Sequence, residues 1–417
     1  MEFAAELSLI DRDRDAFRKK GARHIGRWMS TLFGSAITGA ASRPLRKKDG
    51  YAERSIVRIL QLVHAPRLSG AEVLVKGLAI HHQRGGHEVC MTSLLPEQDD
   101  FADIHAELQA AGVTCLFPEV RYGRIGKLLH LYRVVRRFRP DFIVAHATLA
   151  ALYVRLLPVH TPIAWVMHSG VNDFENGALK RAERLLSRRA RAIIGVSQQN
   201  IDDYLREIGR HPSMVVIPNG VDAQLFAEAN DAGTPDIDLH PKQIVQLGRY
   251  IEGKSQLDTI RAFERVLQSE PDARLLLCGV VEDLDYHRAV LELVRQLGLE
   301  SKVSVGGPRS DVAAILRTSR VFAMPSRFEA QSIGFLEALA SGIPVVASRI
   351  PSFGFASSFA GVNLVDTTDP EAYGNALLSA LNTPRATRQL AGYTLHDTAD
   401  RYMSIARKFA QPLQVSA

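Results

Sequence analysis

Short apolar runs alternate with amphipathic segments along most of the chain. In the first half, the runs typical of buried strands lie at 55–63, 88–93, 114–117, 142–145, 163–167 and 192–196. After a polar stretch at 228–241, further strand-like runs lie at 243–248, 274–278, 303–305, 321–324 and 344–347. Segments with helical spacing separate these runs, and strands that alternate with helices form parallel sheets. The pattern therefore predicts an α/β protein with two doubly wound, Rossmann-like domains that face each other across a cleft.

The same pattern sets the expected domain boundaries. We expect a basic N-terminal extension over residues 1–50, an N-terminal domain over 51–222 and a C-terminal domain over 223–395. The turn-forming sequence Pro218-Asn219-Gly220-Val221-Asp222 marks the junction of the two domains. Residues 396–417 are predicted to form a helix that packs back towards the N-terminal domain. With 417 residues, the chain is long enough for two domains with full cores.

Composition excludes several classes of protein. No apolar run approaches the ~18 residues of a membrane span, and no charged leader with an apolar core opens the chain, so we expect a cytoplasmic protein. Cys90, Cys115 and Cys278 lie far apart in the sequence. Their spacing predicts reduced thiols rather than a disulfide framework or a zinc cluster.

Positive charge is concentrated in the N-terminal half. Of the net charge of +6, most comes from residues 1–50, which contain 11 Lys or Arg against 6 Asp or Glu. A basic amphipathic helix is predicted at 121–139, a segment without acidic residues, and a further basic cluster lies at 180–191. These surfaces either cover a sheet and expose their charged side to water, or attract anionic lipid headgroups. Neither a recognition motif nor an aromatic stacking pattern accompanies the charge, which disfavours nucleic acid as a partner.

Residues 326–348 are the most informative for function, because they combine a loop, an apolar helix and a buried strand. Glu329 lies in the loop, and Glu337 follows after seven intervening residues, inside the helix. The loop comes directly after the strand at 321–324, and open α/β sheets bind ligands at the carboxyl ends of their strands. The N–H groups of Gln331, Ser332 and Ile333 would open the helix and face a bound anion.

This segment resembles the signature of the retaining, nucleotide-sugar-dependent glycosyltransferases of family 4, which have the two-domain GT-B fold. The resemblance covers about residues 55–410. It implies that Glu329 contacts the donor sugar, that Glu337 binds the ribose hydroxyls, and that the amides between them hold the pyrophosphate. Ala330 and Ser332 stand where the family commonly has glycines, so the loop is expected to be stiffer and the donor preference altered.

Other positions match further parts of the family's donor site. Gly248-Arg249 and Lys254 resemble the segment that neutralises the donor pyrophosphate, where cations stabilise the departing nucleoside diphosphate. Gly70 belongs to the small-residue loop after the first strand, where the family brings its backbone close to the phosphates. Arg309 follows the strand at 303–305, on the side where the family packs the nucleotide base.

Two histidines follow strands of the N-terminal domain. His168 matches the family histidine that projects into the cleft near the donor sugar and the acceptor. His146 matches the second of two histidines that the family often shows, and Val144 occupies the place of the first. A histidine at the carboxyl end of a strand can hydrogen-bond a sugar hydroxyl or a phosphate at neutral pH. We therefore expect His168 to act with Glu329, Arg249 and Lys254 in catalysis, and His146 to lie on the acceptor side.

The resemblance implies transfer of a hexose or an N-acetylhexosamine from a nucleotide diphosphate sugar to an acceptor hydroxyl, with the anomeric configuration retained. The basic clusters favour a membrane-held glycan or lipid-linked saccharide as the acceptor, as in cell-envelope polysaccharide synthesis, and a peripheral position on the inner face of the membrane. Two other classes stay open at this stage. A nucleotide-sugar epimerase has a related fold, and a non-catalytic partner in envelope assembly would retain the fold alone.

Neither a cofactor nor a metal is expected. Asp283 and Asp285 have a spacing that holds a divalent metal in other proteins. Such tripeptides are frequent by chance, and the family that the chain resembles uses protein cations instead. We therefore expect a metal-independent reaction.

Overall fold

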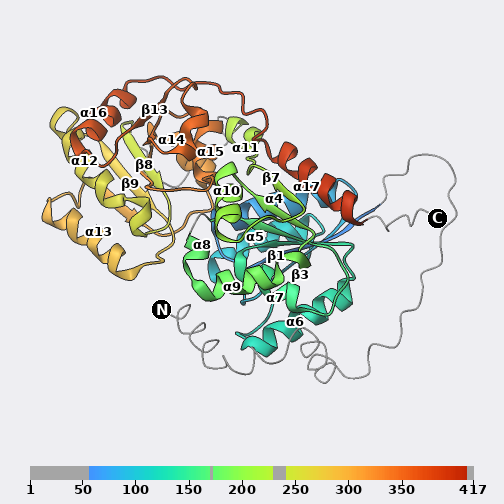
Figure 1. Cartoon of the computed structure of the whole chain (residues 1–417). Helices are drawn as coiled ribbons and strands as arrows, with labels where there is room; N and C mark the ends of the chain where they lie inside the picture. The colour runs from blue at the N-terminus through green and yellow to red at the C-terminus, as the bar shows by residue number, and fades with distance from the viewer. Residues whose placement is uncertain (1–55, 170–171, 229–240, 411–417) are drawn as a thin grey trace.

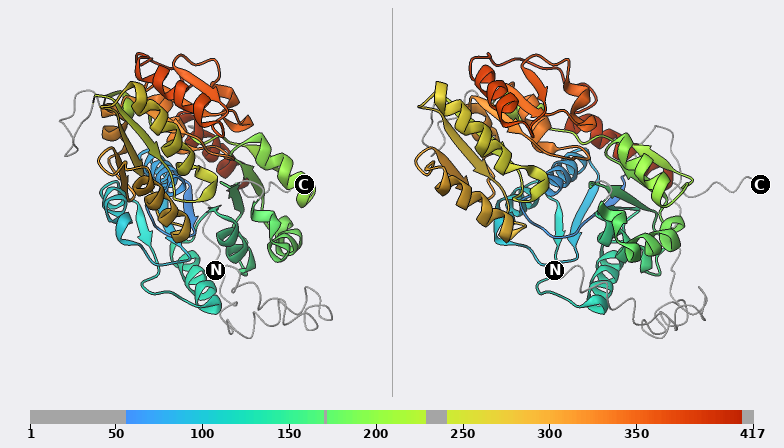
Figure 2. Two further views of the ribbon diagram at one scale, coloured as in Figure 1. Left: turned by 90° about the vertical axis from the view of Figure 1, so that its left-hand side faces the viewer. Right: turned by 60° about the vertical axis from the view of Figure 1, so that its left-hand side comes forward.

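The computed structural model describes residues 56–169, 172–228 and 241–410. Within these ranges the chain forms two parallel β-sheets in two domains, with helices packed on the sheets (Figures 1 and 2). The predicted α/β architecture of two Rossmann-like domains is thereby confirmed. The extension expected at 1–50 lies outside the described residues. With it lie four apolar residues for which the sequence leaves two roles open, insertion into a bilayer or packing against the protein itself or a second subunit: Trp28, Met29, Leu32 and Phe33.

The N-terminal domain contains a seven-stranded sheet of order β3-β2-β1-β4-β5-β6-β7. Its strands are β1 (Arg58–Val63), β2 (Glu88–Ser93), β3 (Thr114–Leu116), β4 (Phe142–His146), β5 (Ile163–Met167), β6 (Ala192–Gly195) and β7 (Met214–Val216). The strand order reverses between β1 and β4, which pair in parallel. Ligands of such sheets bind at this reversal, beyond the carboxyl ends of the strands.

The strands of this sheet are buried on both faces. Alternate residues of β1 point to opposite sides, so that Ile59 packs in one core and Leu60 in the other. The helices of the domain are α4 (Gly70–Arg84), α5 (Ala102–Ala110), α6 (Arg124–Phe138), α7 (Thr148–Leu156), α8 (Asn172–Glu175), α9 (Gly177–Leu186) and α10 (Gln198–Glu207). Burial on both faces explains why the strands appear in the sequence as continuous apolar runs.

The C-terminal domain contains a six-stranded parallel sheet of order β10-β9-β8-β11-β12-β13. Its strands are β8 (Gln243–Leu247), β9 (Arg274–Cys278), β10 (Val303–Gly306), β11 (Val321–Met324), β12 (Val345–Ser348) and β13 (Val362–Val365). Its helices are α11 (Ala223–Glu228), α12 (Gln256–Ser269), α13 (Leu284–Gln296), α14 (Val312–Thr318), α15 (Ile333–Ala340) and α16 (Pro370–Leu381). Strand β13 was missed by the sequence pattern because it is a short edge strand with an exposed Asn363 and half-buried neighbours.

The last described helix, α17 (Leu395–Ala410), leaves the C-terminal domain and lies against α4 of the N-terminal domain (Figure 1). Ala399, Tyr402, Met403 and Ala406 of α17 share a buried core with Leu74 of α4. Apolar burial of this kind stabilises a helix position by about 25 cal/mol for each Å² removed from water. The N-terminal domain thus owes part of its core to the end of the chain.

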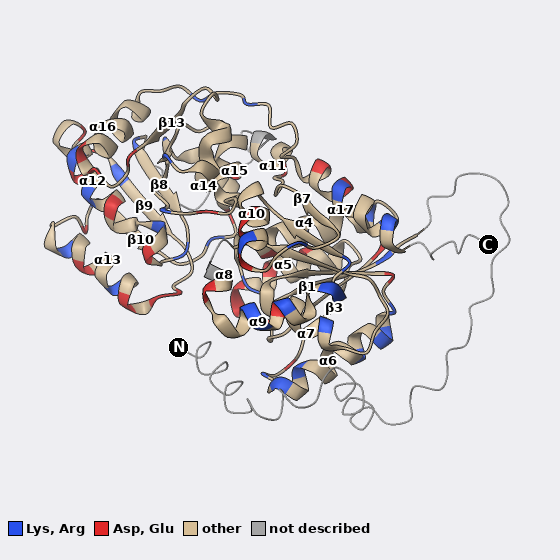
Figure 3. Cartoon of the chain, in the orientation of Figure 1, with Lys and Arg blue, Asp and Glu red and all other residues tan. Residues whose placement is uncertain are grey.

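Helix α6 corresponds to the basic amphipathic helix predicted at 121–139, and Figure 3 shows Lys and Arg along it. Arg124, Arg133, Arg136 and Arg137 are exposed. Lys127 does not belong to this charged surface as the sequence suggested, because it is buried, with its ammonium nitrogen 5.8 Å from the centre of the Tyr153 ring. In the described part of the chain, no helix combines the length and the apolar character needed to cross a membrane.

Candidate functional site

A cleft of about 460 Å³ lies between the two domains. Its volume falls in the range of small-molecule sites, roughly 300–1,000 Å³. The walls come from the loops after β1, β4 and β5 on the N-terminal side and from the loops after β8, β9, β10 and β11 on the C-terminal side. The site residues predicted from the sequence all line this cleft: Gly70, His146, His168, Gly248, Arg249, Lys254, Arg309, Glu329, Gln331, Ser332, Ile333 and Glu337.

The two glutamates occupy different positions on the C-terminal wall. Glu329 lies in the loop before α15, and its carboxylate accepts a hydrogen bond from the ammonium of Lys254. Both side chains of this pair are largely buried, with 12% and 14% of their surface exposed. Glu337 lies inside α15, where burial raises its pKa to about 7 in spite of the opposing effect of Lys76. At neutral pH, Glu337 is therefore close to its titration point.

Helix α15 begins beside these carboxylates. Ser332 is its N-cap, and the Ser332 hydroxyl accepts a hydrogen bond from the N–H of Phe335 at 3.3 Å. Ser332 and Ile333 line the cleft, so the positive end of the helix dipole lies at the ligand space. Serine in place of the family's usual glycine thus supplies a cap that glycine lacks.

The loop after β8 presents Arg249 and Lys254 to the cleft. Arg249 donates to Glu282 at 2.6 Å, and Glu282 also lies 3.8 Å from Arg67 of the N-terminal domain. Two buried glutamines, Gln246 and Gln256, donate hydrogen bonds to backbone carbonyls of this loop. Gln256 donates to the carbonyl of Arg249 at 2.9 Å, and Gln246 donates to the carbonyl of Lys254 at 2.7 Å. The backbone that carries both cations is thereby fixed on both sides.

The two histidines form a hydrogen-bonded chain on the N-terminal wall. Nδ1 of His146 lies 3.0 Å from Nε2 of His168, and Nε2 of His146 lies 2.7 Å from Oε1 of Gln61 on β1. Because the carbonyl oxygen of Gln61 only accepts, Nε2 of His146 carries a proton and Nδ1 of His146 accepts from His168. This order leaves Nδ1 of His168 as an acceptor. The two rings also stack, with their centres 5.3 Å apart.

Both histidines are neutral at neutral pH. Burial lowers the pKa of His168 to about 4. Burial, together with the neighbouring His168, also lowers the pKa of His146 well below its usual value. The pair can therefore exchange hydrogen bonds with hydroxyls without bringing positive charge to this wall.

The two domains touch close to the site. A Cβ atom on Gly70 would lie 3.4 Å from Cβ of Ile333, so a small residue lets the β1 loop approach α15. The connector between the domains also reaches the loop before α15. The amide N–H of Asn219 donates to the side-chain oxygen of Gln331 at 2.5 Å, and the Asn219 side chain donates to the Gln331 carbonyl at 3.0 Å. Gln331 thus links the loop before α15 to the junction of the two domains, a contact that the sequence did not indicate.

Two predicted candidates have partners of their own. The Arg309 guanidinium forms two hydrogen bonds with Asp311, at 2.8 and 2.6 Å, while it lines the cleft. Asp283 is the N-cap of α13 and accepts from the N–H groups of Asp285 and Tyr286. Asp285 pairs with Arg288 of the same helix. The carboxylates of this Asp-x-Asp segment are therefore engaged in forming the start of α13.

Three residues of the site were missed from the sequence: Gln61, Glu72 and Glu282. Glu72 lines the cleft and accepts from the hydroxyl of Ser69, and burial raises its pKa above the usual value. The Ser-x-x-Glu spacing is a capping signal that would have drawn attention to Glu72. Gln61 and Glu282 had no such local signal, because their partners come from distant parts of the chain.

The arrangement is suited to a ligand that carries both phosphates and hydroxyls. Arg249, Lys254 and the first turn of α15 offer positive charge and amides on one wall. Glu337 offers a carboxylate that accepts from hydroxyls when it is ionised. The neutral histidines on the opposite wall offer hydrogen bonds to further hydroxyls.

Comparison with known families covers both domains. The family described as Glycosyltransferase Family 4 matches residues 68–225, and the family described as Glycosyl transferases group 1 matches residues 241–383. The twelve predicted site residues that line the cleft fall within these two ranges.

Individual proteins show the same relationship. The D-inositol 3-phosphate glycosyltransferase of Corynebacterium diphtheriae is 28% identical over 241 residues, which are 54% of this chain and 56% of that protein. The UDP-Gal:alpha-D-GlcNAc-diphosphoundecaprenol alpha-1,3-galactosyltransferase of Escherichia coli is 24% identical over 277 residues, 60% of this chain and 69% of that protein. The chain thus spans between half and about two thirds of the length of these relatives.

Solved structures share the architecture over most of their length. The Anabaena HepE structure, in complex with UDP and glucose, superposes with a TM-score of 0.66 at 19% sequence identity. The superposition covers 84% of this chain and 95% of that one. The likeness extends across both domains, which is further evidence for the fold.

Proposed function

We infer the function from the family, because the chain belongs to the family 4 glycosyltransferases, which have the GT-B fold. We propose that it moves a hexose or an N-acetylhexosamine from a nucleotide diphosphate sugar to an acceptor hydroxyl. The anomeric configuration is retained in this reaction. The observation that carries this proposal is the convergence of two cations, two carboxylates and a helix N-terminus on one cleft between the domains. These groups complement the phosphates and hydroxyls of a nucleotide sugar.

In the proposed complex, the diphosphate lies between Arg249, Lys254 and the first turn of α15. Glu337, inside the helix, accepts from the ribose hydroxyls, while Glu329 contacts the donor sugar. In the structure, Lys254 is paired with Glu329 and Arg249 with Glu282. The diphosphate therefore replaces Glu329 and Glu282 as the partner of these cations. Exchange of one anion for another keeps the cations paired throughout, which lowers the cost of desolvating them.

The proposed reaction breaks the bond between the anomeric carbon and the diphosphate oxygen and forms a bond to the acceptor oxygen on the same face. The proton of the acceptor hydroxyl passes to a phosphate oxygen, so no protein carboxylate acts as a nucleophile. Arg249 and Lys254 stabilise the negative charge that grows on the leaving diphosphate. His168 accepts a hydrogen bond from a sugar hydroxyl through Nδ1 and orients the reacting groups.

A membrane-held glycan or lipid-linked saccharide is the proposed acceptor. The Escherichia coli relative is named for a diphosphoundecaprenol-linked substrate, and this supports an acceptor of the same kind. Basic residues on α6 give the N-terminal domain an exposed positive surface, and Ile125 on the same helix is 51% exposed. Basic charge beside an exposed apolar side chain favours an anionic bilayer surface.

The nucleotide-sugar proposal is tested by a thermal-shift screen against UDP, GDP and ADP, followed by their sugars. A ligand at 100 times its dissociation constant adds about 2.7 kcal/mol to stability, which is readily measured. Donor consumption is then followed with and without a lipid-linked acceptor. Turnover that depends on the acceptor supports transfer, and turnover of donor alone would instead indicate an epimerase. No stabilisation by any of these nucleotides would contradict the proposal.

The membrane surface is tested by co-sedimentation with anionic vesicles at rising salt. Screening shortens the reach of surface charge to about 8 Å at physiological ionic strength, so binding should weaken with salt. Arg136→Glu with Arg137→Glu on α6 should weaken it further. The matched control, Arg288→Glu with Arg295→Glu, makes the same change of charge on exposed residues of α13 in the other domain. Equal binding by both variants would refute a role for α6.

A further inference from the structure

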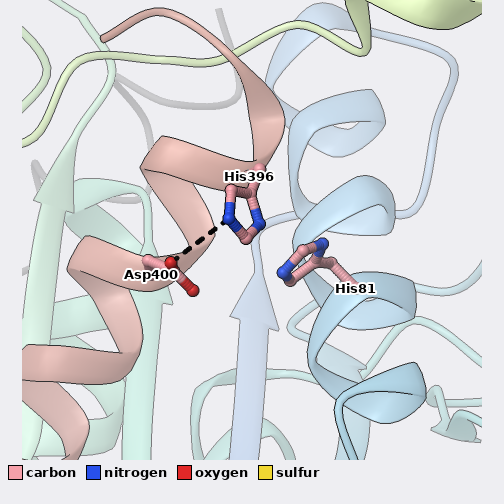
Figure 4. Close-up of side chains that lie close together, drawn as sticks. All are labelled: His81, His396 and Asp400. Carbon is pink, nitrogen blue, oxygen red and sulfur yellow. Dashed lines mark ion pairs between the residues drawn. The ribbon is translucent and has the colours of Figure 1, made fainter.

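Three potential metal ligands meet where α17 lies against α4, outside the cleft. His81 comes from α4, while His396 and Asp400 come from one turn of α17 (Figure 4). One ligand atom from each residue can be chosen such that all three lie within 4.8 Å of one another. None of the three lines the cleft or matches a position of the predicted donor site.

One of the separations is close to that of a tetrahedral metal site. Nε2 of His396 lies 3.5 Å from Oδ2 of Asp400. Two ligand atoms bound at about 2.0–2.1 Å to one tetrahedral zinc ion are about 3.3–3.4 Å apart. The His81 ring completes the group, with its centre 5.2 Å from that of His396. His396 and Asp400 are exposed and His81 is half-buried, so the side chains have room to rotate towards a shared ion.

The backbone beneath the cluster is held in place independently of any metal. A Cβ atom on Gly77, one turn before His81, would lie only 3.0 Å from the side chain of Leu395, so the two helices approach closely here. His82 donates from Nε2 to the carbonyl of Ala399 at 2.9 Å, and this hydrogen bond is buried. The helices therefore present the three ligands in a fixed relation, which reduces the entropy lost when a metal binds.

The chemistry of the ligands selects the ion. Two imidazole nitrogens and one carboxylate oxygen suit zinc and neighbouring transition metals, whereas magnesium prefers oxygen ligands alone. Within the described part of the chain, the His81 side chain makes ring contacts but no hydrogen bond, so a metal would give its nitrogen a partner.

We propose that His81, His396 and Asp400 bind one divalent transition-metal ion, with zinc as the best match, and that the ion fastens α17 to α4. The three protein ligands leave a fourth position for water. The metal takes no part in sugar transfer in this proposal. It stabilises the seam by which the end of the chain is attached to the N-terminal domain, because its ligands are together only when both helices are folded and packed.

The test is titration calorimetry of the full, metal-free protein with zinc chloride, compared with magnesium chloride. We expect one site for zinc, no heat of binding with magnesium, and loss of the zinc site in His396→Ala. His396 and Asp400 have 69% and 65% of their side-chain surface exposed, so neither replacement should prevent folding. The matched control is His160→Ala, which removes an exposed histidine outside the cluster and should leave the zinc isotherm unchanged.

Thermal unfolding provides the second readout. Zinc should raise the midpoint of the wild-type protein and of His160→Ala, but not that of His396→Ala or Asp400→Asn. The proposal is overturned if His396→Ala and His160→Ala bind zinc equally well. It is also overturned if zinc raises the midpoint of the His396→Ala variant as much as that of the wild type.

Discussion

The two walls of the cleft differ in how they treat charge. On the C-terminal wall, Arg249, Lys254 and Glu329 are charged and paired, and Glu337 is poised near its titration point. On the N-terminal wall, burial keeps His168 and His146 neutral.

Burial also disfavours the charged form of Glu72 on the N-terminal wall, because it raises the pKa of this carboxyl. The C-terminal wall thus supplies mainly ions to a ligand, whereas the histidines of the N-terminal wall supply hydrogen bonds without charge, and Arg67 is a cation that this wall adds at the cleft.

This difference fits the proposal that a single cleft binds two chemically unlike groups. A diphosphate needs compensating positive charge, whereas a sugar hydroxyl needs a donor or an acceptor of matched direction. Positive histidines on the N-terminal wall would compete with Arg249 and Lys254 for the phosphates. Desolvation of the histidines removes that competition.

The largest expected effect is on the charged wall. Lys254→Ala should lower kcat/KM for donor by about a hundredfold or more, because a few kcal/mol of charge stabilisation is lost in the transition state. Steady-state kinetics with a nucleotide sugar and acceptor checks this. Lys302→Ala, which removes a surface lysine bonded to the Pro271 carbonyl, should leave the rate unchanged. Chelation with EDTA should also leave the wild-type rate unchanged. Loss of activity in EDTA that magnesium or manganese restores would show that Arg249 and Lys254 do not stabilise the diphosphate alone.

The two glutamates should separate binding from turnover. Glu337→Ala should weaken binding of the free nucleoside diphosphate by about 1.5–3 kcal/mol, the value of hydrogen bonds to a charged group. Glu329→Ala should lower kcat while it changes the affinity for free nucleotide much less. Calorimetry with nucleotide and kinetics with donor measure the two quantities. Equal and negligible effects of both variants would reject the assignment of their roles.

Nucleotide affinity should depend on pH through Glu337 of the C-terminal wall but not through the histidines of the N-terminal wall. In the proposed complex, ionised Glu337 accepts from the ribose hydroxyls and its protonated form accepts less well, so nucleotide affinity should fall as pH falls through about 7. A carboxyl with this pKa is about one tenth ionised at pH 6 and about nine tenths ionised at pH 8, which predicts roughly tenfold weaker binding at pH 6 than at pH 8.

Calorimetry between pH 6 and 8 checks this prediction. Glu337→Gln isolates the effect from the titration of the phosphates, because it should remove the part of the slope that belongs to the carboxyl. His168, with a pKa of about 4, should add nothing in this range. An unchanged slope in Glu337→Gln would show that the carboxyl does not titrate on binding.

The smallest effect is expected on the neutral wall. Gln61→Leu should lower kcat by about fivefold, since it removes one hydrogen bond of about 1 kcal/mol that orients His146 and, through it, His168. The nucleotide affinity should stay unchanged, which a loss of overall structure would not allow. Gln243→Leu is the matched control, because it replaces a buried strand glutamine that is bonded to Ser319 away from the cleft. Equal effects of both variants on kcat would refute a positioning role for Gln61.

The sequence predicted the parts of the site that depend on local spacing. Glu329 and Glu337 are separated by a fixed stretch of loop and helix, so their placement at the carboxyl end of β11 followed from periodicity alone. Most strands were predicted for the same reason, because burial on both faces gives them continuous apolar runs. The resemblance to family 4 added residues whose separate signals were weak, such as Gly70 and His146.

Contacts that depend on register between distant segments could not be predicted in this way. Gln61 meets His146 because β1 pairs with β4 so that Val63 lies opposite His146. No local pattern contains that register. For the same reason, Lys127 was placed on the charged face of α6, because the sequence does not show that Tyr153 of α7 covers it. Strand β13 was not predicted for a related reason, because an edge strand is only partly buried and lacks a continuous apolar run.

The contribution of α17 to the N-terminal core has a consequence for how the protein is made. A ribosome completes the strands and helices of the N-terminal domain long before it reaches Ala399, Tyr402, Met403 and Ala406, the residues that cover one side of that core. Until then, the cluster that contains Leu74 and Leu78 of α4 lacks these four residues. We therefore expect nascent or truncated chains that lack α17 to expose apolar surface and to aggregate more readily than the full chain.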